Sequence, residues 1–232
     1  EGTKSMSFAM HASAAIVFAR TTPEGRGRGI TAFLVELDRD GIQRRPFPDL
    51  GTRAVGRGAV DFHGTWIPAR NRLGARGAGF TEVMQGFDFS RALIGLQVLG
   101  AAQVTLEETW EYTSTRTAFD RPLSTFQGLA FPLAEAETLL AAARLLCQKT
   151  LWLKDSGLPH TKEAAMCKWW APKTAYDVIH QCLLSHGQAG YLTDRPIEQR
   201  LRDVLGLQIG DGTAQIMKLV ISRHSVPREC AP

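Results

Sequence analysis

Several features that mark particular classes of protein are absent from this sequence of 232 residues. No apolar run approaches the roughly 18 residues that a membrane-spanning helix needs. The first residues lack the basic segment followed by an apolar segment that marks a signal peptide. Only four cysteines occur, none at CxxC spacing, so we expect reduced thiols and no metal site. These absences predict a cytoplasmic protein without a membrane span.

Charge and aromatic content also give little support for a nucleic-acid partner. The net charge is +4 and the pI is about 9.0, which permits an anionic partner without requiring one. Arginines are scattered along the chain, and aromatic residues make up only 8% of it, so no basic stripe with interleaved aromatic side chains is present. We therefore expect no nucleic acid among the partners.

The first 75 or so residues have the pattern of β-structure. Residues 14–20 (AAIVFAR) and 30–37 (ITAFLVEL) are strand-like apolar runs, and the turn-rich TTPEGRGRG between them predicts a hairpin. A further strand region is predicted in residues 58–68 (GAVDFHGTWIP).

From Gly79 onward apolar residues recur at helical spacing, which predicts long helices with short connections and hence an antiparallel bundle. Ser124 and Gln127 match a capping box at the start of the second helix. Pro132 is expected to kink this helix or to lie in its first turns, and Pro172 to kink the third. The predicted helices cover residues 80–116, 123–154, 161–187, 197–205 and 212–224.

One carboxylate stands out between two glycines, in the stretch QIGDGTAQI at residues 208–216. Asp211 lies just before a predicted helix, and Asp followed by Gly-Thr is a good helix N-cap. A carboxylate in a dry site is also a suitable base for a weakly acidic carbon-bound proton. The residues by themselves leave both interpretations open.

Several motifs occur together in a fixed order: GFDFSR at 86–91, TRTAFDRPLSTFQGLAFPLAEAE at 115–137, HGQAGYLTDRPIEQRLRD at 186–203 and IGDGTAQIMKLVISRH at 209–224. In order and spacing they resemble the acyl-CoA dehydrogenase family, and TAFLVELDRDGI (31–42) and LGTRAVGRGAVDFHGTWIP (50–68) are similar to its middle domain. The resemblance implies an α+β fold, with a partial β-barrel or sheet domain followed by an antiparallel four-helix bundle. The expected boundaries are 1–76 for the last part of the β domain, 77–226 for the bundle and 227–232 for a tail.

Family members have a helical domain before the β domain, and this chain begins partway through the β domain. We therefore expect either a fragment or a partner chain that supplies the missing part. The resemblance implies flavin-dependent α,β-dehydrogenation of an acyl-CoA, in which an α-proton is removed and a β-hydride passes to N5 of FAD. It also implies an electron-transfer flavoprotein as acceptor and a homodimer or homotetramer. The alternative is a non-catalytic or half-site subunit of a heteromeric enzyme.

At the position of Asp211 the family most often has the Glu that serves as base, so the resemblance favours Asp211 as the catalytic residue. Other members carry the base at the position of Ser90, which cannot act as one at neutral pH. An Asp at the position of Asp211 resembles the cyclohexanecarboxyl-CoA dehydrogenase branch of the family, and this resemblance implies an alicyclic substrate. Arg91 is expected to support the base loop and Asp88 to contact the CoA adenine, unless they form an ordinary i,i+3 pair on a helix surface.

The resemblance also implies a set of flavin contacts. Arg116 would hold the FAD pyrophosphate of a neighbouring subunit, since its planar guanidinium suits phosphate oxygens. Asp120 replaces a usual Gly and Ala118 a common Thr, which is expected to weaken the grip on flavin. Leu184 departs further, because it replaces a usual Gln and cannot make its hydrogen bond. The other expected cofactor-binding residues are Phe119, Gln127, Gly187, Thr213, Gln215 and Ser7. For Gln127 the capping box, and for Thr213 and Gln215 an ordinary place in a first helical turn, are the alternatives.

Overall fold

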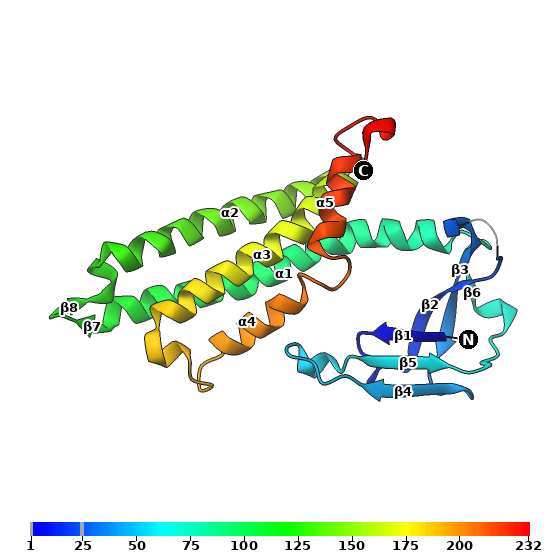
Figure 1. The fold of residues 1–232 in the computed structure, drawn as a ribbon, viewed down its shortest axis with the longest axis horizontal. Coiled ribbons are helices and arrows are strands. Elements are labelled where there is room, and N and C mark those ends of the chain that lie inside the picture. Colours follow the sequence, from blue (N-terminus) through cyan, green and yellow to red (C-terminus); the bar gives the residue numbers. More distant parts are fainter. Residues whose placement is uncertain (1, 24–25) are drawn as a thin grey trace. The chain divides into compact units, whose positions relative to one another are not determined.

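The computed structural model describes residues 2–23 and 26–232 (Figure 1). The chain divides into two compact units, residues 1–86 and 87–232, at a point inside the first long helix, α1 (Gly79–Thr115). Each unit has its own set of contacts, and each is described by itself.

The first unit consists of two antiparallel three-stranded sheets, with strand orders β1-β5-β4 and β2-β3-β6. The predicted hairpin is confirmed, because β2 and β3 pair antiparallel along their whole length, from Ala14 opposite Glu36 to Arg20 opposite Ile30. The predicted strand region at 58–68 supplies the central strand β5 of the other sheet. A small apolar cluster of Ala9, Leu37 and Val60 forms the core. The strands are β1 (Gly2–Met6), β2 (Ala14–Arg20), β3 (Ile30–Glu36), β4 (Ile42–Pro46), β5 (Gly58–Phe62) and β6 (Arg72–Leu73).

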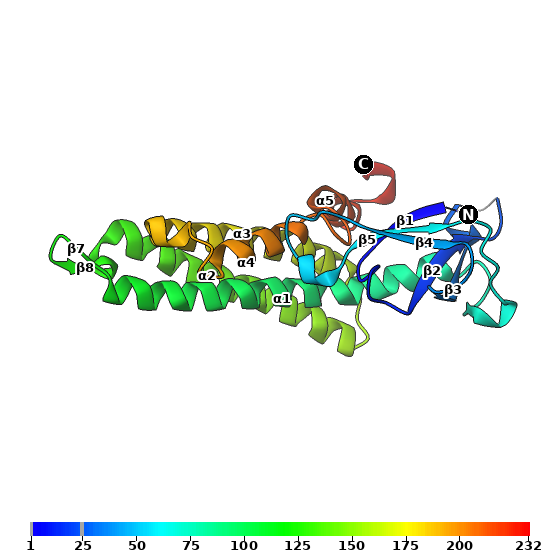
Figure 2. The ribbon, with the colours of Figure 1, turned by 90° about the horizontal axis from the view of Figure 1, so that it is seen from below.

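The second unit is a helical bundle, in which α1, α2, α3 and α4 run alternately in opposite directions (Figures 1 and 2). The predicted α+β fold with an antiparallel bundle is confirmed. The short strands β7 (Thr117–Ala118) and β8 (Arg121–Pro122) make a small hairpin between α1 and α2. The remaining helices are α2 (Gln127–Asp155), α3 (Thr161–Ser185), α4 (Ile197–Gly206) and α5 (Ala214–Arg223).

The start of α2 differs from the prediction. Ser124 lies in a 3-10 turn, Leu123–Thr125, and α2 begins at Gln127 after Phe126, which makes no side-chain cap bond. The predicted capping box is therefore wrong, because the turn places Ser124 outside the first turn of the helix. Pro132 lies in the second turn of α2 and Pro172 inside α3, and neither ends its helix.

The bundle core is built from small and branched apolar side chains on α1 to α4. Gly95 marks a close approach of α1 to α2, since a Cβ atom there would lie 2.6 Å from Sγ of Cys147. Burial of this apolar surface drives the helices together and excludes water from the bundle interior. The fully buried members of the core include Leu99, Ala102, Leu106, Leu133, Leu140, Cys147, Cys167, Ala175 and Ile179.

In the described part of the chain, α1 is long and apolar enough to cross a bilayer by length and composition, with a mean hydropathy of 1.2 in its most apolar window. Nearly half of that window, 44%, is buried inside the protein. Leu99, Ala102 and Leu106 of α1 belong to the bundle core. The apolar character of α1 is therefore accounted for by packing in the bundle.

Candidate active site

The loop between α4 and α5 carries Asp211. The chain leaves α4 in a tight turn, in which the amides of Ile209 and Gly210 both donate to the carbonyl of Gly206, at 3.1 and 3.0 Å. Asp211 then adopts a left-handed backbone conformation with a φ of 54°. Few side chains tolerate this conformation, and Asp is one of them. Gly212 follows with a φ of 109°, and a Cβ atom there would lie 2.7 Å from Cε of buried Met217.

The N-cap of α5 is Thr213, whose Oγ1 accepts a hydrogen bond from the amide of Ile216 at 3.4 Å. The interpretation of Asp211 as the cap is therefore wrong, because Asp211 lies two residues before the cap with its backbone turned away from helical geometry. Its side chain is exposed, and within residues 2–23 and 26–232 no group donates a hydrogen bond to its carboxylate. A carboxylate held in a strained loop without a structural partner is available for chemistry.

Arg91 and Asp88 of α1 form a buried ion pair. The Nη1 of Arg91 donates to Oδ1 of Asp88 at 2.9 Å, and Oγ1 of Thr161 donates to Oδ2 of Asp88 at 2.6 Å. The i,i+3 pairing is thus present, but the two side chains are only 7% and 14% exposed, so it is not a surface pair. A Cβ atom on Gly212 would lie 3.9 Å from Nη2 of Arg91, which places this guanidinium against the loop that carries Asp211. The Nε of Arg91 is buried and has no partner among the described residues.

Lys168 of α3 is a residue that the sequence interpretation missed. It is fully buried, and its Nζ donates to two carbonyls of the loop, Leu207 at 2.6 Å and Gly212 at 3.2 Å. Burial lowers the pKa of Lys168 to about 8, an effect that the charge of Asp211 opposes and that of Arg91 reinforces. The one sign in the sequence is a lysine within the otherwise mainly apolar run AAMCKWWAP at 164–172.

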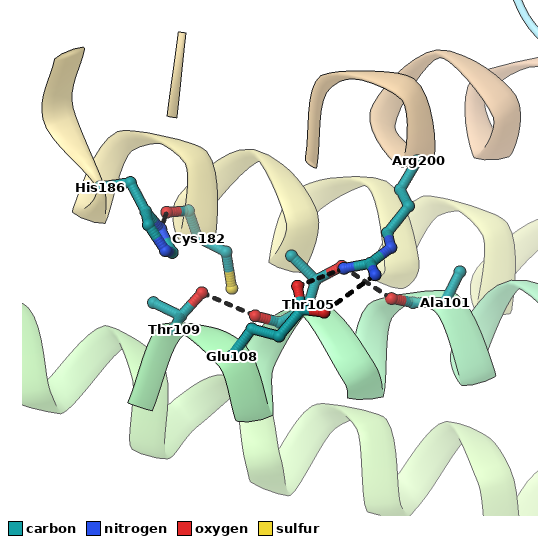
Figure 3. Close-up of polar contacts among 7 residues, drawn as sticks. All are labelled: Ala101, Thr105, Glu108, Thr109, Cys182, His186 and Arg200. Carbon is teal, nitrogen blue, oxygen red and sulfur yellow. Dashed lines mark hydrogen bonds and ion pairs between the residues drawn. The ribbon is translucent and has the colours of Figure 1, made fainter. Parts of the chain in front are cut away.

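A second polar network fixes α4 against α1 (Figure 3). The guanidinium of Arg200 donates to both carboxylate oxygens of Glu108, at 2.5 and 3.0 Å, and to Oγ1 of Thr105 at 3.1 Å. Thr105 in turn donates to the carbonyl of Ala101 at 2.8 Å. The hydrogen bond from Arg200 holds the pKa of Glu108 below its usual range. Because the loop that carries Asp211 begins where α4 ends, the two hydrogen bonds from Arg200 to Glu108 help to position that loop.

The hairpin that joins α1 and α2 holds the expected flavin residues Arg116 and Phe119. Both central residues of its turn are left-handed, Phe119 with a φ of 52° and Asp120 with a φ of 61°. Such a turn favours Gly, Asn or Asp, which explains both the Gly usual in the family and why Asp is tolerated here. Phe119 is 88% exposed, and Arg116 is also exposed.

The expected cofactor residues fall into separate groups. Asp211, Thr213 and Gln215 belong to the loop before α5 and to its first turn. The start of α5 lies at one end of the bundle, and the β7–β8 hairpin lies at the other (Figures 1 and 2). Gly187, with a φ of 58°, opens a 3-10 turn at the hairpin end, and Gln127 is exposed at the start of α2. One bundle therefore does not bring the two groups together. Ser7 belongs to the first unit, in the exposed turn after β1.

His186, beside Gly187, is buried. Its Nδ1 lies 2.9 Å from the carbonyl of Cys182 (Figure 3), and its ring stacks on Tyr112 with 4.3 Å between ring centroids. Burial lowers the pKa of His186, so the neutral ring is favoured. These contacts give His186 a packing role. Among the described residues, no group of three or more His, Cys, Asp or Glu side chains could hold a metal ion.

Residues 77–226 match the family model described as "Acyl-CoA dehydrogenase, C-terminal domain". The chain belongs to the acyl-CoA dehydrogenase family. It is 39% identical to the mitochondrial short-chain specific acyl-CoA dehydrogenase of Mus musculus over 225 residues, which are 96% of this chain and 55% of that relative. The chain therefore spans about half the length of the curated relatives it matches.

Solved structures of this family have the same fold. Butyryl-CoA dehydrogenase from Megasphaera elsdenii matches with a TM-score of 0.91 and 32% identity, over 95% of this chain and 58% of that one. A chain from a study of the electron transferring flavoprotein of Acidaminococcus fermentans matches with a TM-score of 0.92 and 32% identity, over 96% of this chain and 59% of that one. Likeness to these two structures extends over both units of the chain.

Proposed function

We propose that the protein catalyses flavin-dependent α,β-dehydrogenation of an acyl-CoA thioester, with Asp211 as the base. The observation that carries this proposal is the state of Asp211. Its backbone is left-handed and it is not the N-cap of α5. It is exposed, next to the buried side chains of Arg91 and Lys168. Membership of the acyl-CoA dehydrogenase family supports the reaction type. We propose residues 77–226 as the domain that carries the flavin and acyl-CoA sites, after the β domain at 1–76 and before the tail at 227–232.

The proposed chemistry begins with transfer of the substrate α-proton to a carboxylate oxygen of Asp211. Negative charge then grows on the thioester oxygen, where hydrogen-bond donors stabilise it. The backbone N–H of Asp211 has no acceptor within the described residues, so it is free to donate to that oxygen. FAD, when bound, supplies the acceptor for the hydride that leaves the β-carbon. Arg91 lies against the loop and supports it, and Asp88 acts through Arg91 because both of its carboxylate oxygens already accept hydrogen bonds.

The residues present fit FAD if two copies of the chain cooperate. At the hairpin end, Arg116 and Gln127 offer an exposed guanidinium and an exposed amide, and Phe119 an exposed aromatic face. Thr213 and Gln215 lie near Asp211 at the other end, so we propose that each flavin takes its pyrophosphate contacts from one copy and its ribityl or adenine contacts from another. A homodimer or homotetramer follows from this arrangement. Gly187 and Ser7 are the remaining proposed flavin contacts.

The substrate and the electron acceptor are narrower proposals. Asp is one methylene shorter than the usual Glu, and we propose that this suits a bulkier, alicyclic acyl group such as cyclohexanecarboxyl-CoA. The relatives named for short-chain and butyryl substrates make butyryl-CoA the comparison substrate. An electron-transfer flavoprotein is the proposed acceptor, and a matching chain from a study of such a flavoprotein supports it. We propose a cytoplasmic location, in keeping with four free cysteines.

A second candidate function is a half-site subunit that needs a partner chain. Leu184 favours it, because this 57% exposed apolar side chain stands where the family usually has a flavin-site Gln. Absorbance spectra of the purified chain, alone and with candidate partners, separate the two functions. Stoichiometric flavin on the chain alone supports the enzyme, and flavin that is retained only with a second chain supports the subunit.

Substitution of Asp211 tests the proposed base. Asp211→Asn keeps the left-handed conformation accessible but cannot accept a proton, so flavin bleaching by butyryl-CoA or cyclohexanecarboxyl-CoA should slow by about 10²–10⁴-fold. Asp211→Glu moves the carboxylate outward and should cost about 10²-fold with the alicyclic substrate and less with butyryl-CoA. Asp177→Asn, which changes an exposed carboxylate on α3, is the matched control and should bleach at the wild-type rate. Bleaching at the wild-type rate in Asp211→Asn would remove Asp211 from the reaction.

A further inference from the structure

Lys168 is the largest side chain that is fully buried in the described residues. Its ammonium donates to the carbonyls of Leu207 and Gly212, which lie on either side of Asp211 in the chain. A methionine would fill the same space without the free-energy cost of burying a charge. Packing of the bundle therefore does not by itself require a lysine at this position.

The two carbonyls explain what the ammonium does. Leu207 is the C-cap residue of α4, where carbonyls lack partners inside the helix and the helix dipole favours a cation. Gly212 follows Asp211 directly, after the left-handed turn. The ammonium of Lys168 thus binds the carbonyl at the end of α4 and the carbonyl of the residue after Asp211, and so connects the two ends of the loop.

We propose that Lys168 is a positioning residue for the base, because its ammonium holds both ends of the 207–212 loop and so fixes the place of the Asp211 carboxylate. The inference rests on the proposed function, since it takes Asp211 as the base. A displacement of about 1 Å in a reacting group can lower a rate by on the order of 10²-fold. If the loop could shift, the proposed reaction would therefore lose most of its rate, although the carboxylate would still be present.

Lys168→Met in the flavin-loaded protein tests this role with two measurements. Hydrogen exchange reports on the loop directly, because the amides of Gln208, Ile209 and Gly210 are hydrogen-bonded at the end of α4. Stopped-flow bleaching with butyryl-CoA reports on the chemical step, and α-deuterated butyryl-CoA shows whether proton removal limits it. Lys173→Met is the matched control, since Lys173 lies on the same helix with a side chain that is 55% exposed.

We expect loop amides in Lys168→Met to exchange about 10–100-fold faster while the bundle core is unchanged. Bleaching should slow by about 10²-fold, with a larger isotope effect and an apparent Kd for butyryl-CoA within about threefold of wild type. Lys168→Gln, which keeps an N–H donor on a shorter side chain, should recover part of both losses. Lys173→Met should match the wild type in both measurements.

Faster loop exchange with wild-type bleaching would overturn the positioning role and leave Lys168 purely structural. Slower bleaching with an unchanged loop would also overturn it. If Lys168→Met does not fold, Lys168→Gln carries the same test, and failure of both to fold would show a structural role. A different variant shows whether the proposed function itself fails. In that case the flavin in Asp211→Asn would bleach at the wild-type rate, whatever the hydrogen exchange of the loop in the Lys168 variants.

Discussion

The buried ammonium of Lys168 makes a quantitative prediction for stability as a function of pH. Its pKa in the folded protein is about 8, against an ordinary value of 10.5. Between these two values the unfolded chain binds more protons than the folded protein, so the free energy of unfolding rises with pH. For one such group the increase is about 2.5 kcal/mol from pH 7 to pH 10. Below pH 7 the group is protonated in both states and contributes no slope.

Lys168→Met isolates this contribution, because every other titrating group is common to both proteins. Urea denaturation at pH 7, 8, 9 and 10 gives the free energy of unfolding of each protein. The difference, wild type minus variant, should rise by about 2.5 kcal/mol across the series. The charged groups that act on Lys168 are Asp211 and Arg91, and loss of the Asp211 charge should lower the pKa of Lys168 further. In an Asp211→Asn background the rise should therefore begin at lower pH.

A difference that stays flat from pH 7 to pH 10 would refute the reasoning, because it would mean that Lys168 titrates normally when folded. A fall would mean that the charged form is favoured by its surroundings and that the two carbonyls outweigh burial. The ¹³Cε resonances of labelled lysine provide an independent check. One resonance, absent in Lys168→Met, should titrate near pH 8.

Two further predictions concern the loop cap and the bundle core. Thr213→Ala removes the acceptor for the amide of Ile216 and should lower the free energy of unfolding, measured in urea, by about 1 kcal/mol. Asp211→Asn should change it by less than about 0.5 kcal/mol. Equal losses in the two variants would restore Asp211 as the cap. Gly95→Ala places a Cβ 2.6 Å from Sγ of Cys147 and should cost about 1–3 kcal/mol, most of which Cys147→Ala in the same chain should recover. An unchanged free energy of unfolding in Gly95→Ala would show that α1 and α2 can move apart here without loss of stability.

The fold was largely predictable because its patterns are long. Residues 14–20 and 30–36 form a hairpin, as their apolar runs and intervening turn residues predict. The helices follow from apolar spacing repeated over many turns, so an error at one end changes little. The start of α2 was missed because a local S-x-x-Q pattern fits any turn followed by a helix. Only the 3-10 turn after β8 decides where the first helical hydrogen bond forms.

The site was less predictable, because its parts come from segments far apart in the chain. Asp211 was singled out because it stands in a glycine-rich stretch with a family resemblance, but its cap role could be rejected only from its φ of 54° and from Thr213 as the N-cap. Lys168 gave almost no signal, since a lysine at helical spacing is usually a solvated side chain. Its role depends on carbonyls about 40 residues later in the chain, at 2.6 and 3.2 Å from Nζ.

The charges at the base end of the bundle also bear on the reaction. Two cations, Lys168 and Arg91, and two carboxylates, Asp88 and Asp211, are clustered there, so the group is neutral overall when all four are ionised. On the proposed mechanism, transfer of the α-proton neutralises Asp211 and leaves a net charge of +1. This charge appears at the moment when negative charge grows on the thioester oxygen, and it is held by side chains that cannot turn away because they are buried. Fixed charge of this kind stabilises the transition state more than the ground state, which is the condition for catalysis. The buried lysine therefore assists the proposed reaction twice, first by holding the base and then by contributing to the positive charge that offsets the negative charge on the thioester oxygen.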